Sequence, residues 1–227
     1  MKVYGKNVLN EVLSNPKKVK KLYMTSNMKD ERIMKSIRNN KIQFESVSKE
    51  AMDRMVKGNH QGIMAIIDDY TYADYKTMFN DSLVVILDHL EDPHNFGAII
   101  RTCEAAGVKS IIIPKDRSVD INETVMKTST GALEYVKVAR VNNLVKVMND
   151  FKDNGFFVYG AEADGISDKT CDYSDKVLLV VGSEGNGLSR LVRENCDEIV
   201  SLPMKGHVNS LNASVAAAIL IYDIVFR

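Results

Sequence analysis

The 227-residue sequence lacks the features of several specialised classes of protein. No apolar run approaches the roughly 18 residues that indicate a transmembrane helix, and the first residues lack the apolar segment of a signal peptide. The three cysteines, Cys103, Cys171 and Cys196, are an odd number without C-x-x-C spacing, and the four histidines are not spaced like metal ligands. We therefore predict a protein of the reducing cytoplasm with no disulfide framework, no metal and no membrane association.

The sequence also lacks the common fingerprints of nucleotide-binding proteins. It contains no Walker A sequence and no G-x-G-x-x-G turn with a following acidic residue. Without a Walker A sequence, a P-loop enzyme is not predicted. Without the glycine fingerprint, a nucleotide-binding dehydrogenase is only a distant alternative.

The chain has no net charge, but two oppositely charged parts produce this neutrality. Residues 1–80 carry 15 basic and 9 acidic residues, whereas residues 81–227 carry 15 basic and 21 acidic residues. The asymmetry favours a basic part that binds a polyanion such as RNA, and a second part with another task.

The first part is predicted to form a small α/β domain at residues 1–67, because short helical and extended patterns alternate. Helices and strands are expected at 7–13, 19–24, 30–39, 42–47, 49–56 and 63–67. Ser48 is the predicted N-cap of the third helix. The polar, tyrosine-rich residues 68–81 are interpreted as a linker.

The second part, residues 82–227, is predicted to be an α/β domain with a mostly parallel sheet. Its short, fully apolar runs are typical of strands that are buried on both faces. The strands are expected at 83–87, 111–113, 156–159 and 177–181, and the helices at 96–106, 144–152, 188–195 and 209–226.

Three polar segments of this domain are the candidate ligand-binding regions, because ligands bind beyond the carboxyl ends of the strands in an open α/β sheet. The first, 87–101, carries Asn95 and Arg101, which would be about 240° apart on one helix and therefore not on one face. The second, 181–188, is rich in glycine, which permits close approach of the backbone to a ligand. The third, 201–214, has more Ser and Asn than a helix cap needs. Each segment alone also fits an ordinary connection between a strand and a helix.

Together, the segments 87–107, 179–188 and 202–218 resemble the three motifs of the SpoU (TrmH) family of RNA ribose 2′-O-methyltransferases, within the SPOUT superfamily. The resemblance covers residues 82–227, and residues 127–134 resemble the family's segment between the first two motifs. The N-terminal sequences Val3–Leu9 and His60–Gly62 resemble the RlmB-like subgroup, which methylates a guanosine ribose of large-subunit rRNA.

The resemblance implies an enzyme that uses S-adenosylmethionine (SAM), a deep C-terminal trefoil knot, a homodimer and an N-terminal RNA-binding domain. The SAM-binding residues that it implies are Gly182, Ser183, Glu184, Gly185, Leu202, Pro203, Met204, Ser210, Leu211 and Asn212. The catalytic residues that it implies are Asn95, Arg101, Glu184, Ser210 and Asn212.

Arg101 matches an arginine that is often assigned as the base in this family. Because a guanidinium resists deprotonation, we expect Arg101 instead to bind the target phosphate and orient the 2′-hydroxyl, with Asn95 positioning Arg101. Arg101 is also a predicted RNA contact. The others are the basic cluster and one histidine: Lys17, Lys18, Lys20, Lys21 and His60. The alternative interpretation of these lysines is a solvated surface.

The predicted reaction is 2′-O-methylation of a ribose in 23S rRNA, with a guanosine as the expected target. The alternatives are the same reaction on tRNA or at an rRNA site linked to thiostrepton resistance. A different class of alternative is a non-catalytic RNA-binding or ribosome-assembly protein with the same fold.

Overall fold

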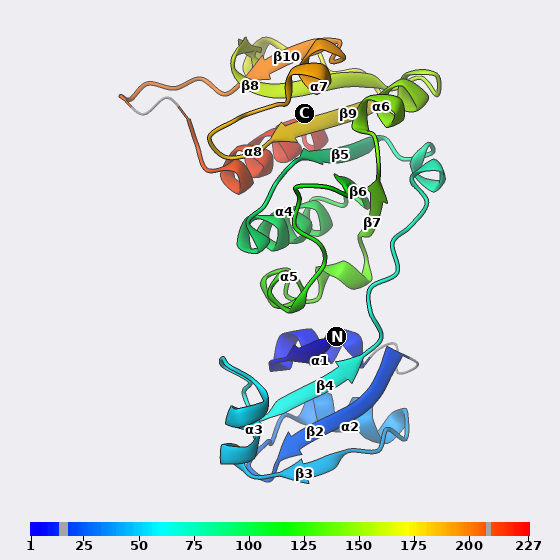
Figure 1. Ribbon diagram of the computed structural model, residues 1–227, viewed down its shortest axis with the longest axis vertical. Helices are drawn as coiled ribbons and strands as arrows, with labels where there is room; N and C mark the ends of the chain where they lie inside the picture. The colour runs from blue at the N-terminus through cyan, green and yellow to red at the C-terminus, as the bar shows by residue number, and fades with distance from the viewer. Residues whose placement is uncertain (14–17, 208–209) are drawn as a thin grey trace. The chain divides into compact units, whose positions relative to one another are not determined.

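The computed structural model describes residues 1–13, 18–207 and 210–227, which form two compact units (Figure 1). The first unit contains residues 1–71 together with residues 121–134. The second unit contains residues 72–120 and 135–227.

The first unit is built on a mixed four-stranded sheet with the order β1-β4-β2-β3, in which only β2 and β3 are parallel neighbours. Its strands are β1 (Lys2–Tyr4), β2 (Val19–Thr25), β3 (Glu45–Val47) and β4 (Ile63–Ile67). Its helices are α1 (Lys6–Val12), α2 (Glu31–Asn39), α3 (Lys49–Met55), α5 (Glu123–Thr128) and a 3-10 turn at Ala132–Glu134. The Ser48 side chain accepts a hydrogen bond from the Ala51 amide, which confirms the predicted cap.

Residues 121–134 join the first unit through specific contacts. The Lys18 ammonium lies 2.7 Å from the Glu134 carboxylate, and the Lys127 ammonium lies 5.0 Å from the centre of the Tyr4 ring. Gly131, at φ +99°, lies so close to Glu11 that any side chain at this position would overlap it. The sequence alone does not indicate this grouping, because about fifty residues of the second unit separate residues 121–134 from residues 1–71.

The second unit contains a six-stranded, wholly parallel sheet with the order β10-β8-β9-β5-β6-β7, which confirms the predicted α/β class. Its strands are β5 (Leu83–Asp88), β6 (Ser110–Pro114), β7 (Lys137–Val141), β8 (Phe157–Ser167), β9 (Val177–Gly182) and β10 (Glu198–Ser201). Its helices are α4 (Pro93–Ala105), α6 (Leu144–Lys152), α7 (Arg190–Glu194), α8 (Ala213–Val225) and 3-10 turns at Tyr75–Met78 and Asp168–Thr170.

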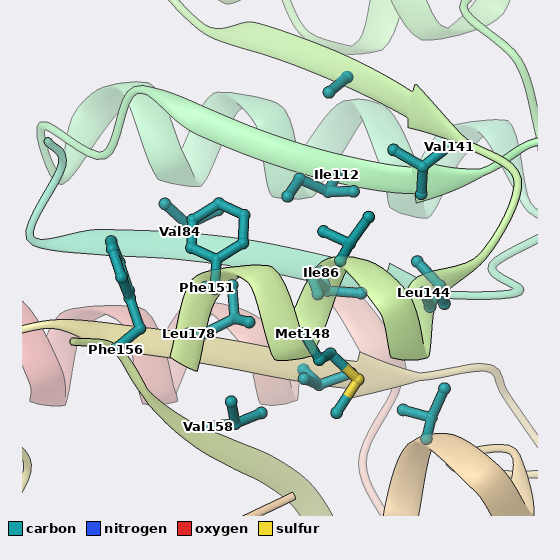
Figure 2. Close-up of a cluster of buried hydrophobic side chains, with 14 of the residues drawn as sticks. Val84, Ile86, Ile112, Val141, Leu144, Met148, Phe151, Phe156, Val158 and Leu178 are labelled. Carbon is teal, nitrogen blue, oxygen red and sulfur yellow. The ribbon is translucent and has the colours of Figure 1, made fainter. Parts of the chain in front are cut away.

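Helices cover both faces of this sheet. On one face, α6 and α7 pack over the apolar side chains of the central strands, and Figure 2 shows Met148 and Phe151 of α6 among them. On the other face, α4 packs against α8, which also contacts β9. Burial on both faces explains why these strands are continuous apolar runs in the sequence.

The connections from β5 and β9 leave the sheet toward opposite faces. β5 continues into α4, and β9 continues into α7 on the other side. Because these two strands are parallel neighbours, a crevice is expected between their carboxyl ends, where ligands bind in open α/β sheets. Among the described residues, no helix is long and apolar enough to cross a membrane.

Candidate active site

The carboxyl ends of β5 and β9 bring the first two candidate segments together. Asp88, the last residue of β5, is the register partner of Gly182, the last residue of β9. The loop after β5 leads to α4, whose N-cap is Asp92, while the loop after β9 is the glycine-rich segment. The two loops therefore start side by side.

The glycine-rich loop closes on itself. The Ser183 amide donates to the Gly187 carbonyl at 3.1 Å, and the Gly187 amide donates back at 3.0 Å. A Cβ on Gly182 would lie 2.2 Å from the backbone of Gly187, so this turn requires glycine at position 182. Gly185, at φ +85°, has open space where a Cβ would lie, so the tip of the loop is free to approach a ligand.

Two carboxylates hold the end of this loop. Glu162 of β8 accepts a hydrogen bond from the Leu188 amide at 2.6 Å, and Asp88 accepts one from the Ser189 amide at 2.6 Å. The Ser189 amide belongs to the N-cap of the short helix α7, and the Leu188 amide to the residue before that cap. The loop is therefore anchored to both neighbours of β9.

Glu184 joins all three candidate segments. One of its carboxylate oxygens, Oε1, accepts hydrogen bonds from the amide groups of Asn95 and Asn212, the second at 2.8 Å. Asn95 is buried in the first turn of α4, and Asn212 is the N-cap of α8, where its own oxygen accepts from the Ser214 amide at 3.0 Å. The extra polar groups at the start of α8 therefore serve Glu184 as well as the helix.

The other predicted catalytic residues form no hydrogen bond with Glu184 among the described residues. Arg101 is exposed, nearly two turns further along α4 than Asn95, and Asn95 is bonded to Glu184 instead of Arg101. Ser210 is also exposed. Of the remaining predicted SAM contacts, Leu202 is half-buried, and Pro203, Met204 and Leu211 are exposed.

The predicted RNA contacts of the first unit have different surroundings. Lys18 is paired with Glu134 and Lys20 with Asp68, whereas Lys21 is exposed, and Lys17 lies outside the described residues. His60 is buried: its Nε2 lies 2.8 Å from Asp53, and its Nδ1 accepts from the Gly62 amide at 2.9 Å. Both ring nitrogens of His60 thus have partners within the protein, and its expected RNA contact stays a prediction.

The described residues contain no group of three or more potential metal ligands. Three carboxylates do lie near the two loops, Asp88, Glu162 and Glu184, but each of them accepts hydrogen bonds from protein amides.

Comparison with known proteins identifies the family to which the chain belongs. Residues 82–222 match the SpoU rRNA Methylase family, and residues 2–73 match the family described as RNA 2′-O ribose methyltransferase substrate binding. The chain belongs to the SpoU methylase family. It is an RNA (ribose-2′-O)-methyltransferase that uses S-adenosylmethionine, which confirms the predicted enzyme class and cofactor.

Individual relatives agree with this assignment. A protein of Staphylococcus aureus (strain MSSA476), assigned by name to the TrmH family of tRNA/rRNA methyltransferases, is 42% identical and aligns over 99% of this chain and 95% of its own length. The structure of the SpoU methyltransferase AviRb from Streptomyces viridochromogenes, in complex with the cofactor AdoMet, has a TM-score of 0.85 at 24% identity and covers 100% of this chain and 89% of its own. The A. aeolicus TrmH/SpoU tRNA modifying enzyme has a TM-score of 0.56 at 33% identity and covers 63% and 74%.

The residues of this SpoU methylase suit SAM chemically. The cofactor is a sulfonium cation with an adenosine part, and the site offers the exposed Glu184 carboxylate beside a glycine loop tip with open space. A negative charge favours a cation, and open space beside a glycine backbone admits a ligand.

Sequence reasoning missed Asp88 and Glu162, the two carboxylates that anchor the glycine-rich loop. Asp88 and Glu162 act on amides that are 101 and 26 residues away in the chain, and no local pattern reports such a pairing. The available signal was position, since Asp88 and His89 directly follow a buried apolar strand.

Proposed function

We propose that this SpoU methylase transfers the methyl group of SAM to the 2′-oxygen of a guanosine ribose in 23S rRNA. The observation that carries this proposal is the cluster of Asn95, Glu184 and Asn212, which links the three motifs beside the glycine-rich loop. SAM supplies an activated methyl group when bound, so the chain's own residues mainly have to position the reactants. The basic first unit is proposed to bind the rRNA, and the cytoplasm is the proposed location.

Residues 182–185, 202–204 and 210–212 are proposed to hold SAM, with Glu184 facing its positive charge. Asn95 and Asn212 hold the Glu184 carboxylate in one orientation. Arg101 is proposed to bind the phosphate of the target nucleotide and orient the ribose, through its fork of N–H donors.

We also propose a homodimer, which would bring a second copy's Arg101 to the site. The last helix supports this proposal, because Val215, Ile219, Tyr222 and Phe226 recur at helical spacing and are exposed by 37% to 66%. An apolar stripe of this kind is unusual on a monomer. The trefoil knot is likewise a proposal for residues 82–227.

The test uses purified protein with radiolabelled SAM and, separately, deproteinised 23S rRNA and bulk tRNA. We expect label in 23S rRNA, at a 2′-oxygen of one guanosine, and none in tRNA. Label in tRNA alone would contradict the rRNA proposal and support tRNA as the substrate. The name of the S. aureus relative includes both kinds of RNA. SAM binding measured by calorimetry, with no transfer to any RNA or to assembling ribosomal subunits, would instead favour a non-catalytic protein.

A further inference from the structure

A pocket of about 290 Å³ opens beside Glu184, and His89 and Arg117, which also line it, have no role in the proposed function. Its walls are residues 89–92 of the loop after β5, Arg117 of the loop after β6, and Ser183, Glu184 and Asn186 of the glycine-rich loop. All three walls belong to the second unit. The pocket therefore adjoins the cluster that joins the three motifs.

Two of these walls are bonded together. The Leu90 carbonyl accepts hydrogen bonds from the Val119 amide at 2.9 Å and from the Ser118 hydroxyl at 3.2 Å. This double contact fixes the loop after β6 against the loop after β5. His89 and Arg117, each next in sequence to a bonded residue, are thereby held at one opening.

His89 is oriented by a buried carboxylate. Its Nδ1 lies 2.5 Å from Oδ1 of Asp88, whose side chain is completely buried, and Oδ2 of Asp88 accepts from the Ser189 amide. A carboxylate only accepts hydrogen bonds, so the proton of the neutral imidazole lies on Nδ1. Nε2 then carries a free electron pair, and no described residue bonds to it.

Both His89 and Arg117 have a backbone conformation that is unfavourable for residues other than glycine. Their φ angles are +57° and +50°, and only three other described non-glycine residues have positive φ values. Residues other than glycine that are held in this conformation are strained, and they cluster at functional sites. Two of them line this one pocket, although neither is needed there to fill a core.

We propose that this pocket receives the target ribose with its adjoining phosphate, that His89 accepts the proton of the 2′-hydroxyl, and that Arg117 contacts the same phosphate that is assigned to Arg101. The inference rests on the proposed methylation of an RNA ribose. It assigns the proton acceptor to a group with a free electron pair, which the guanidinium of Arg101 lacks.

The reaction balances with SAM as the only other reactant. The 2′-oxygen forms a bond to the methyl carbon while the carbon–sulfur bond breaks, and sulfur keeps the electron pair and becomes a neutral thioether. The hydroxyl proton moves to Nε2 of His89, and the resulting imidazolium is stabilised by Asp88. One quarter of the His89 side chain is exposed, so the proton can pass to solvent before the next turnover.

The first experiment compares His89→Asn and His89→Gly in single-turnover methyl transfer at saturating SAM and RNA. Asn and Gly both adopt positive φ, so neither variant strains the loop. We expect transfer to slow by roughly 10²–10⁴-fold, as for loss of a general base, while SAM affinity by calorimetry stays within about twofold. Added imidazole should accelerate His89→Gly at least tenfold and leave the wild type unchanged.

Wild-type transfer rates in both variants, or a slow His89→Gly that imidazole does not accelerate, would overturn the assignment of His89. If the wild type itself methylates no RNA, the proposed function fails instead, so the two failures are distinguishable. A readout that is independent of activity is the ¹H–¹⁵N spectrum of the imidazole, in which we expect the proton on Nδ1. A proton on Nε2 at neutral pH would also overturn the base assignment.

The second experiment tests Arg117 by RNA affinity. Arg117→Ala should weaken binding of a methylatable rRNA fragment and reduce the magnitude of the salt dependence by about one ion, as loss of one phosphate contact does. Lys115→Ala is the matched control, because Lys115 is an exposed cation of the same loop that does not line the pocket. If Arg117→Ala and Lys115→Ala had equal RNA affinity and equal salt dependence, the proposal that this pocket binds a phosphate would be wrong.

Discussion

At the scale of single residues, the structure of the site depends on carboxylates that accept hydrogen bonds from nearby amide groups. Glu184 accepts hydrogen bonds from two side-chain amides, and Asp88 and Glu162 accept them from the two backbone amides just before α7. Removing such an acceptor leaves a polar group unpaired, whereas changing its charge alone does not. This distinction separates the electrostatic role of Glu184 from its structural role.

Glu184→Gln keeps an oxygen that can accept from Asn95 and Asn212 but removes the negative charge. Because Glu184 is exposed, we expect SAM affinity to fall only about two- to fivefold, without a change in the melting temperature. Glu184→Ala should lose more affinity and also stability, because the buried Asn95 amide loses its partner. Calorimetric titration and thermal unfolding measure the two effects, and equal SAM affinity in Glu184→Gln and wild type would contradict the charge interaction.

Burial raises the pKa of the Cys103 thiol from 9.0 to about 12. In the folded protein the thiol therefore stays neutral between pH 9 and 12, whereas in the unfolded chain it ionises. Stability is thus retained below pH 9 and falls as the pH rises, with a slope of up to about 1.4 kcal/mol per pH unit from this group.

Cys103→Ala tests this linkage. Its free energy of unfolding, measured with urea from pH 8 to 11, should fall less steeply above pH 9 than that of the wild type. The neutral-pH cost of the smaller side chain does not affect this comparison of slopes. Parallel slopes for the two proteins would contradict the raised pKa.

At the scale of elements, the sequence predicted the central strands well because their burial on both faces leaves an unbroken apolar signal. The runs at 83–87 and 177–181 correspond to β5 and β9 within one residue. It missed β1, β7, β10 and α5, and it predicted that α8 begins at 209 rather than at Ala213. β7 and β10 are short strands with charged residues at Lys137, Arg140 and Glu198, so their pairing, rather than their composition, defines them.

The candidate site could likewise be predicted only in part, because contacts between distant segments leave no local pattern in the sequence. Resemblance located Asn95, Glu184 and Asn212, and the structure brings them together. It also named Arg101 and Ser210, which are exposed and form no hydrogen bond with Glu184 among the described residues. No periodicity reports the Asp88–His89 pair, because its function depends on a loop conformation at φ +57°.

The packing of residues 121–134 within the first unit predicts an unusual sensitivity at Gly131. Gly131→Ala combines an unfavourable positive φ with overlap against the Glu11 side chain, so we expect a loss of about 2 kcal/mol and a fall in melting temperature of roughly 4–8 °C. Gly107→Ala is the control, because Gly107 has φ +79° but no atom within 4 Å of the added Cβ. Equal melting temperatures for the two variants would contradict the packing of Gly131 against Glu11.

At the scale of the whole molecule, a net charge of zero divides into a basic part and an acidic part with different proposed tasks. The first would bind RNA, and the second would hold a cationic methyl donor and form the dimer. In this account, catalysis needs both parts and a second copy, because the exposed Arg101 lies outside the Glu184 cluster of its own chain.

Ile219→Glu tests the dimer. Ile219 lies in the middle of the exposed apolar stripe of α8, so a charge there should shift sedimentation from dimer to monomer and reduce methyl transfer at least tenfold. Leu191→Glu is the control, because Leu191 is an exposed apolar residue of α7 outside the stripe. A monomeric wild type, or full transfer by a monomeric Ile219→Glu variant, would contradict the shared site.

The central claim is that this SpoU methylase modifies one ribose of 23S rRNA. The most direct measurement is a map of all 2′-O-methyl groups in the rRNA and tRNA of cells with and without its gene. We expect one guanosine 2′-O-methyl group of 23S rRNA to disappear without the gene, the wild-type gene to restore it, and an Arg101→Ala gene not to restore it. Unchanged rRNA methylation, with or without a loss in tRNA, would contradict it.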